Sequence, residues 1–118
     1  MDSLITRTAV LLLGLFVAVT AAVAAGDRVA DAILDIQHRW AHIHYQLPED
    51  QQGTALSELE SDGAALMKEY PDRAEPLVWE AIVLSTHAGV KGGLGALSMV
   101  RKARDLLGRA YEYFISQF

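Results

Sequence analysis

The feature that most constrains the fold of this chain is a repeat, because its second half resembles its first at an offset of about forty residues. The matching pairs are Leu56 and Leu97, Leu66 and Leu107, Tyr70 and Tyr111, and, at a slightly shorter offset, Trp40 and Trp79. A period of this length in helical sequence indicates repeated helix pairs. Such units cannot bury their apolar faces alone, so they stack, and the stack commonly presents a binding surface.

Four helices are predicted after residue 25, three of them from apolar residues at alternating steps of four and three. Their stripes are Val29, Ile33, Ile36, Trp40, Ile43 and Leu47; Leu56, Leu59, Gly63, Leu66 and Tyr70; and Ala96, Val100, Ala103, Leu107, Ala110 and Phe114. The third helix, from Pro76 to Ala88, is apolar on nearly all sides and is expected between the others. No stretch alternates convincingly like a strand, so the predicted fold class is all-α, with two stacked helix-turn-helix repeats.

Proline and glycine residues predict the helix boundaries. Pro48 is expected to end the first helix and to open a polar turn that runs to Thr54. Gly89 is expected to end the third helix, ahead of a glycine-rich connection. Gly63 lies on the apolar stripe of the second helix, where we expect it to let a neighbouring helix approach closely.

The amino-terminal segment, residues 1–25, has the layout of a secretory signal peptide. An apolar run from Ala9 to Ala25 follows Arg7, and Ala22, Val23 and Ala24 form an A-x-A cleavage site. The alternatives are an uncleaved membrane anchor or a buried core helix, since the run is at the short end for a membrane span. Cleavage or anchoring would place the domain at 26–118 in the periplasm or another space outside the cytoplasm.

Composition excludes several classes of function. The 118 residues contain no cysteine, which rules out disulfides, thiolate metal sites and a cysteine nucleophile. A formal net charge of −5 argues against a general nucleic-acid binder, which needs a basic face. Acidic residues predominate from Asp27 to Glu75, and basic residues predominate from Pro76 to Phe118. This asymmetry is either ordinary surface variation or a basis for association with another copy or an acidic partner.

The mature region resembles the tetratricopeptide repeat family, and most closely its exported members in Gram-negative bacteria. The resemblance rests on Trp79, on the Gly-Gly-Leu-Gly-Ala-Leu run at 92–97, and on Ala-Arg-Asp-Leu-Leu at 103–107. It implies a periplasmic helical-repeat protein whose usual role is protein or peptide binding. The first unit is longer than the family's repeat, and an apolar end without a cap leaves open a short or truncated version. That end also implies that the last helix packs on a missing repeat, a second copy or a partner.

One constellation has the spacing of metal ligands. Asp31, Asp35, His38 and His42 share one face of the first helix, and histidines at i and i+4 can chelate one metal ion. The simpler interpretation, which the sequence favours, is a solvated face with Asp35 paired to Arg39. Among the remaining residues no nucleophile and base combine with an oxyanion site, and the glycine-rich connection lacks the P-loop ending. We therefore expect no enzyme activity and no cofactor.

The function that the sequence favours is an exported, non-enzymatic scaffold that binds a protein or peptide in the cell envelope. Trp40, Tyr45 and Trp79 are the expected anchors wherever they reach the surface, because Trp and Tyr dominate interface energetics. Core packing is the alternative role for the two tryptophans. The alternative function is a periplasmic accessory protein that binds a small ligand or a metal through the aspartate and histidine face.

Overall fold

The computed structural model describes residue 26 and residues 28–118. Ala32–Phe118 forms one compact unit, and the described residues up to Asp31 belong to a second unit. The predicted signal peptide, residues 1–25, lies outside the described residues. No helix within the described residues is long and apolar enough to cross a membrane.

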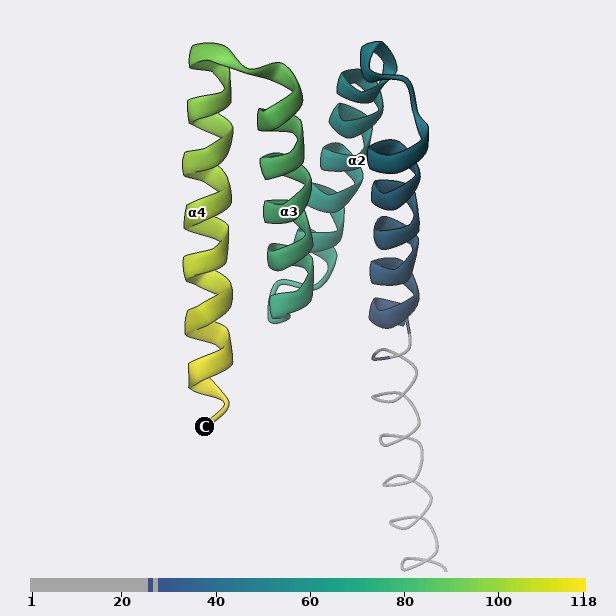
Figure 1. Ribbon diagram of the computed structural model, residues 1–118. Coiled ribbons are helices and arrows are strands. Elements are labelled where there is room, and N and C mark those ends of the chain that lie inside the picture. Colours follow the sequence, from purple (N-terminus) through teal and green to yellow (C-terminus); the bar gives the residue numbers. More distant parts are fainter. Residues whose placement is uncertain (1–25, 27) are drawn as a thin grey trace, which may run out of the picture. The chain divides into compact units, whose positions relative to one another are not determined.

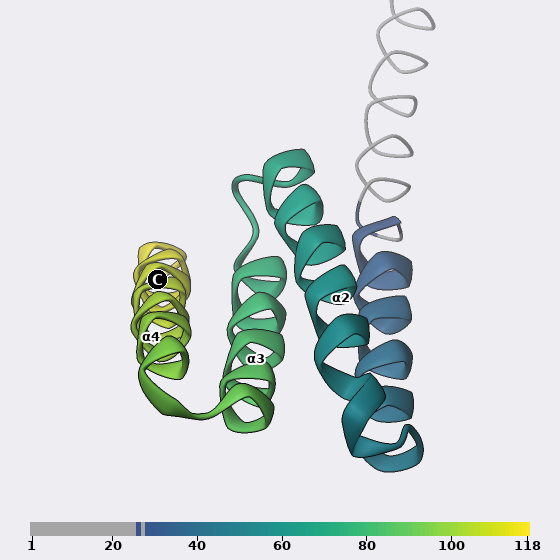
Figure 2. The same cartoon turned by 90° about the horizontal axis from the view of Figure 1, so that it is seen from above.

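Within Ala32–Phe118 the helices run alternately up and down (Figure 1). The first is helical at residues 28–46, and it is followed by α2 (Glu49–Glu69), α3 (Ala74–Lys91) and α4 (Gly93–Ser116). No strand occurs at residue 26 or from 28 to 118, so the all-α prediction is confirmed for this part of the chain. Within Ala32–Phe118, α3 lies between α2 and α4 (Figure 2).

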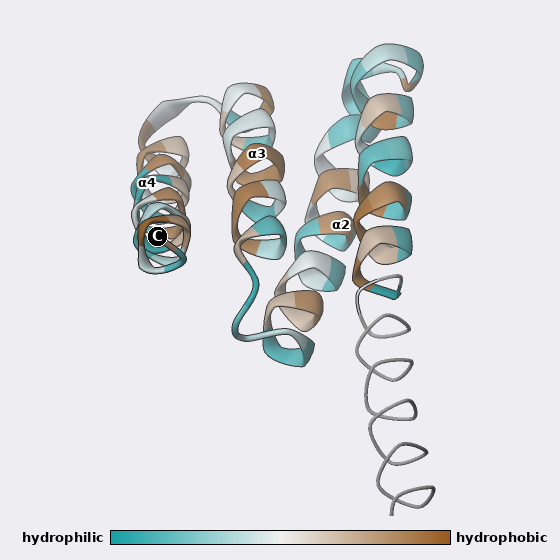
Figure 3. Cartoon of the chain, turned by 90° about the horizontal axis from the view of Figure 1, so that it is seen from below, coloured by the Kyte–Doolittle hydropathy of each residue, from teal (hydrophilic) through white to brown (hydrophobic). Residues whose placement is uncertain are grey.

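The core is centred on α3, as its apolar sequence predicts (Figure 3). One side of α3 packs against α4 through Leu77, Ala81, Leu84, Ala103, Leu106 and Ala110. On α2, the predicted stripe is buried at Leu56, Leu59, Gly63 and Leu66. On the first helix, Ile33, Ile36 and Ile43 are buried, whereas Trp40 and Leu47 are partly exposed. The predicted apolar stripes of these two helices therefore face the core for most of their length.

Two predicted boundaries are wrong. The stretch from Pro48 to Thr54 is not a turn, because Pro48 is the N-cap of α2 and the helix begins at Glu49. The acids Glu49 and Asp50 lie in its first turn, where negative charge stabilises the helix dipole. Gly89 does not end α3, which continues to Lys91 and stops at Gly92, where φ is +63°. That left-handed conformation, which glycine adopts at little cost, makes the turn.

The predicted apolar stripe of α4 is only half correct. Ala103 and Ala110 are buried against α3, but Val100, Leu107 and Phe114 are exposed to about half their area or more. The helix carries two adjacent stripes at the same spacing, and the one that α3 covers contains Leu106 between the two alanines. The small alanine side chains allow α3 and α4 to pack closely there. The second stripe is left open.

Candidate functional site

An aromatic cluster joins the first helix to α3. The rings of Trp40 and Trp79 meet edge to face, with their centroids 6.1 Å apart. The indole N–H of Trp40 donates a hydrogen bond of 2.8 Å to the Thr86 hydroxyl, which in turn donates to the Ile82 carbonyl at 2.9 Å. Both bonds hold Trp40 in one orientation. The two tryptophans therefore form a fixed, partly buried base between two helices.

Two further rings cover that base on the solvent side. The imidazole of His44 stacks on Trp40 at 5.2 Å with an interplanar angle of 10°, and Tyr45 meets Trp40 edge to face at 6.0 Å. His44 and Tyr45 also contact each other, with centroids 4.6 Å apart. Tyr45 is nevertheless 73% exposed. The aromatic cluster (Trp40, His44, Tyr45 and Trp79) thus presents an apolar ring surface to solvent.

The structure brings together the three anchor residues that the sequence predicts, namely Trp40, Tyr45 and Trp79. The tryptophans pack between helices, which is the alternative role that the sequence gives them, and they also remain partly exposed. His44 and Thr86 were not predicted as members of the site. The spacing carried a signal for His44, which lies one helical turn after Trp40 and so on the same face. Nothing in the pattern marked Thr86 as the partner of a residue on another helix.

The aspartate and histidine face does not assemble into a ligand set. Asp35 is paired with Arg39 at 3.3 Å, as predicted, and Arg39 also binds Asp62 of α2 at 2.6 Å. His42 is hydrogen-bonded to Gln46 at 3.1 Å, and Asp31 belongs to the other unit of the chain. Within the described residues, no group of three or more histidines and acids is placed to hold a metal ion.

A buried carboxylate is the strongest electrostatic feature of the described chain. Glu80 of α3 is 1% exposed, and its Oε2 atom has no hydrogen-bond partner. A Cβ added at Gly63 of α2 would collide with this carboxylate. The prediction that a neighbouring helix approaches closely at Gly63 is therefore only partly right, because the nearest atoms belong to the Glu80 side chain and not to the backbone of α3.

The surroundings of Glu80 favour its protonated form. Burial and, after it, the negative charge of Glu60 raise the pKa of Glu80, while Lys102 of α4 lowers it, and the net result is a pKa of about 7. Glu60 is bound to His87 of α3, so a second polar pair crosses the same interface. The sequence analysis did not identify Glu80. The pattern that could have indicated it is an acidic residue within a helix that is otherwise apolar on nearly all sides.

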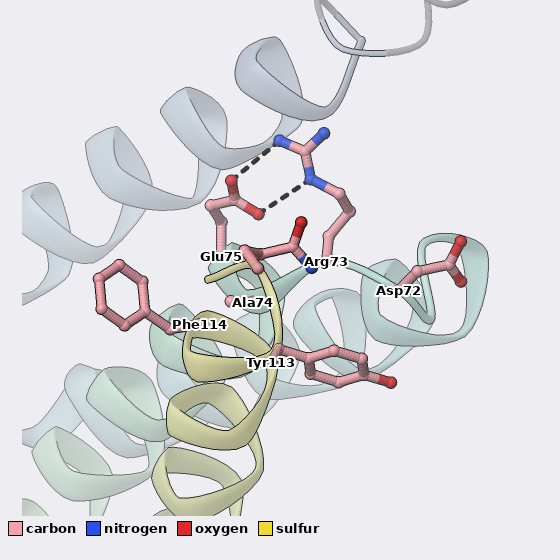
Figure 4. Close-up of a pocket in the computed structure, with 7 residues that line it drawn as sticks. Asp72, Arg73, Ala74, Glu75, Tyr113 and Phe114 are labelled. Carbon is pink, nitrogen blue, oxygen red and sulfur yellow. Dashed lines mark hydrogen bonds and ion pairs between the residues drawn. The ribbon is translucent and has the colours of Figure 1, made fainter.

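An open pocket of about 320 Å³ lies where the end of α4 meets the start of α3 (Figure 4). The Arg73 guanidinium binds the Glu75 carboxylate at 2.9 and 3.1 Å and lowers the pKa of that carboxyl. The Tyr113 hydroxyl donates a 2.7 Å bond to the carbonyl of Pro71. The Tyr113 bond ties α4 to the connection between α2 and α3, so its role is structural.

No family model matches the chain, and no curated protein or solved structure is significantly similar to it. Of the sites described above, Glu80 is closed to solvent and the pocket near Tyr113 is lined by an exposed ion pair. Among these sites, the aromatic cluster holds the largest set of rings in mutual contact, and its Tyr45 is 73% exposed. It is therefore the best candidate for binding another molecule.

Proposed function

We propose that this protein is an exported, non-enzymatic helical-repeat scaffold that binds a protein or peptide through the aromatic cluster. The observation that carries the proposal is the exposed ring of Tyr45 on a base of fixed rings. Tyrosine and tryptophan supply large contact areas with few rotatable bonds, and they are enriched among residues that dominate binding energy. A partner would meet a preformed surface, so little conformational entropy would be lost on binding.

The repeat supports this placement of the site. Trp40 and Trp79 correspond to each other at the repeat offset, and each lies on the first helix of its pair. Their rings meet where the two helix pairs stack, so each helix pair contributes one ring to a shared surface. In this proposal the two helix pairs are tetratricopeptide-like repeats. A longer array would extend the same surface along the stack.

The proposal assigns no reaction to the chain. Among the residues that the structure describes, the acid with a strongly raised pKa is Glu80, which is closed to solvent, whereas a catalytic acid or base must reach the substrate proton. Export rests on the apolar run and the A-x-A site before Gly26. Mass spectrometry of the protein recovered from the cell envelope tests it, with a chain that begins at Ala25 or Gly26 as the expected result.

Capture of envelope proteins on the immobilised chain tests the binding site. We expect Tyr45→Ala to weaken capture about tenfold or more, the usual effect of removing a hot-spot side chain. Leu34→Ala is the matched control, because Leu34 is an exposed apolar residue of the same helix outside the cluster. Both tryptophans of the chain lie in the cluster, so their fluorescence reports directly on binding of any captured protein. Equal capture by the wild type and Tyr45→Ala contradicts the proposed site.

A further inference from the structure

The second apolar stripe of α4 is exposed along most of the helix. Its members follow one another at steps of three, four or seven residues and are 46–93% exposed: Leu97, Val100, Leu107, Tyr111, Phe114 and Phe118. We call them the α4 seam. The rings of Phe114 and Phe118 pack against each other and extend the seam beyond the last turn of the helix. The face is apolar apart from Arg104, an exposed residue at the same spacing between Val100 and Leu107, and an exposed apolar face of this kind marks an interaction surface.

The position of α4 leaves the seam accessible. Within Ala32–Phe118, α4 packs beside α3 through Ala103, Leu106 and Ala110, and it makes no packing contact with α2. Figures 1 and 2 both show α3 as the helix beside α4. The seam lies on an adjoining face of the helix, about a quarter-turn away from the buried stripe at 100° per residue.

The repeat indicates what kind of element covers such a face. At the offset that relates the two halves, Leu97 and Leu107 correspond to Leu56 and Leu66 of α2. These α2 residues are buried, and Gly63, which lies between them, contacts Glu80 of α3. The equivalent face of the first repeat is therefore covered by a helix. The α4 seam has the residue spacing that fits another helix.

We propose that the α4 seam binds the α4 seam of a second copy, with the two helices antiparallel. The seam needs an apolar face of similar size, and on the first helix from residue 32 onward only Leu34 and Tyr45 are large, apolar and well exposed. Within the described chain, the face that matches the seam best is therefore the seam itself. Two-fold pairing of identical surfaces is also the commonest symmetry of protein oligomers.

The charges beside the seam favour the antiparallel orientation. Arg101 lies six residues before Leu107, Glu112 lies five residues after it, and both are on the same flank of the helix. Antiparallel pairing about a point near Leu107 brings each Arg101 close to Glu112 of the second copy. Two-fold parallel pairing would place this flank on opposite sides of the two helices, so Arg101 and Glu112 would not meet across the seam. In the described part of the chain neither residue forms an ion pair, so both are free to bind across the seam.

Disulfide cross-linking of the full chain tests the pairing, since the protein has no cysteine of its own. We expect Leu107→Cys to cross-link to its own copy on mild oxidation, because residue 107 lies near the two-fold axis. Leu97→Cys is the control, as Leu97 is on the same seam with nearly the same exposure, 47% against 46% for Leu107. In the antiparallel pair the two copies of residue 97 lie about 30 Å apart, at 1.5 Å per residue, and cannot be bridged.

Each other pattern overturns the proposal. Equal cross-linking at both positions indicates parallel or non-specific association, including association through any other part of the chain. Failure at both positions shows that a different element covers the seam. A second measurement exchanges the two charges beside the seam in the Leu107→Cys protein. Arg101→Glu is expected to lower the yield of cross-linked dimer at least fivefold, and the addition of Glu112→Arg is expected to restore that yield. Absence of this rescue contradicts the proposed register.

Discussion

Replacing Glu80 with glutamine is expected to stabilise the folded chain above pH 7 and to change its stability little below pH 5. The substitution keeps the size and shape of a side chain that is 1% exposed and removes only its ability to ionise. Burial raises the pKa of Glu80 from 4.5 to about 7, so the folded state binds a proton that the unfolded state has released. Stability therefore falls as the pH rises from about 4.5 to 7 and is constant above that range.

The magnitude follows from the two pKa values. The gap between 4.5 and about 7 corresponds to about 3 kcal/mol, at about 1.4 kcal/mol for each pH unit. Glutamine does not regain all of this free energy, because its amide is also buried opposite Gly63, where the Oε2 atom of Glu80 has no hydrogen-bond partner. We therefore expect Glu80→Gln to raise the free energy of unfolding by about 1–3 kcal/mol at pH 8. For a domain of this size that is a rise in Tm of at least about 5 °C.

Circular dichroism melts at pH 5 and pH 8 measure the effect. The variant retains Glu60, His87 and Lys102, so the difference between the two proteins at each pH isolates Glu80. Glu58→Gln, a change at an exposed acid of α2, is the control and is expected to leave the pH dependence unaltered. The explanation is refuted if the Tm of the wild type is the same at pH 5 and pH 8. It is also refuted if the Tm of Glu80→Gln falls between pH 5 and pH 8 by as much as that of the wild type.

Three further predictions test the packing. Leu106→Ala is expected to lower the free energy of unfolding by about 2–5 kcal/mol and Leu107→Ala by less than about 1 kcal/mol, because Leu106 is 4% exposed and Leu107 is 46% exposed. Chemical denaturation at low protein concentration measures both, and equal losses would mean that the stripe assigned to the α3 interface is wrong. Gly63→Ala is expected to destabilise by about 1–3 kcal/mol through its clash with Glu80, and the loss should shrink when Glu80→Ala is added, as a double-mutant cycle would show. Tyr113→Phe is expected to cost about 0.5–1.5 kcal/mol and to speed amide exchange at the end of α4, and unchanged exchange would count against its bond to the α2–α3 connection.

The helices were predictable because periodicity is a local property. The stripes of the first helix and α2 follow directly from steps of four and three residues, and both face the core. The orientation of α4 was not predictable, since its two stripes have the same spacing. The choice between them depends on how closely Ala103 and Ala110 let α3 approach, which is a tertiary effect. Pro48 does follow the end of the first helix, but the turn predicted after it is wrong because proline also suits the start of the next helix. Gly89 was misjudged because a helix can continue through a glycine at a modest cost in stability.

The candidate site was predictable only as a list of residue types. Large aromatic residues in a binding scaffold are reasonable anchors, and the repeat offset relates Trp40 to Trp79. The hydrogen bond from Trp40 to Thr86, which fixes the cluster, joins helices far apart in the sequence and left no pattern. Glu80 was also missed, because the cost of burying a charge becomes visible only once its neighbours are known.

The two proposed surfaces lie on different elements, so their effects can be separated. The aromatic cluster is built from the first helix and α3, whereas the seam belongs to α4. A dimer through the seam would carry two aromatic clusters, and linking two binding sites can strengthen attachment to a multivalent partner by about 10²–10⁴ without any new contact. Arg101→Glu is thus expected to weaken capture by a surface densely coated with the partner while leaving the affinity for a single partner in solution unchanged. Surface plasmon resonance at high and low coating density measures both, and a loss of affinity for the single partner would mean that the α4 seam itself takes part in partner binding.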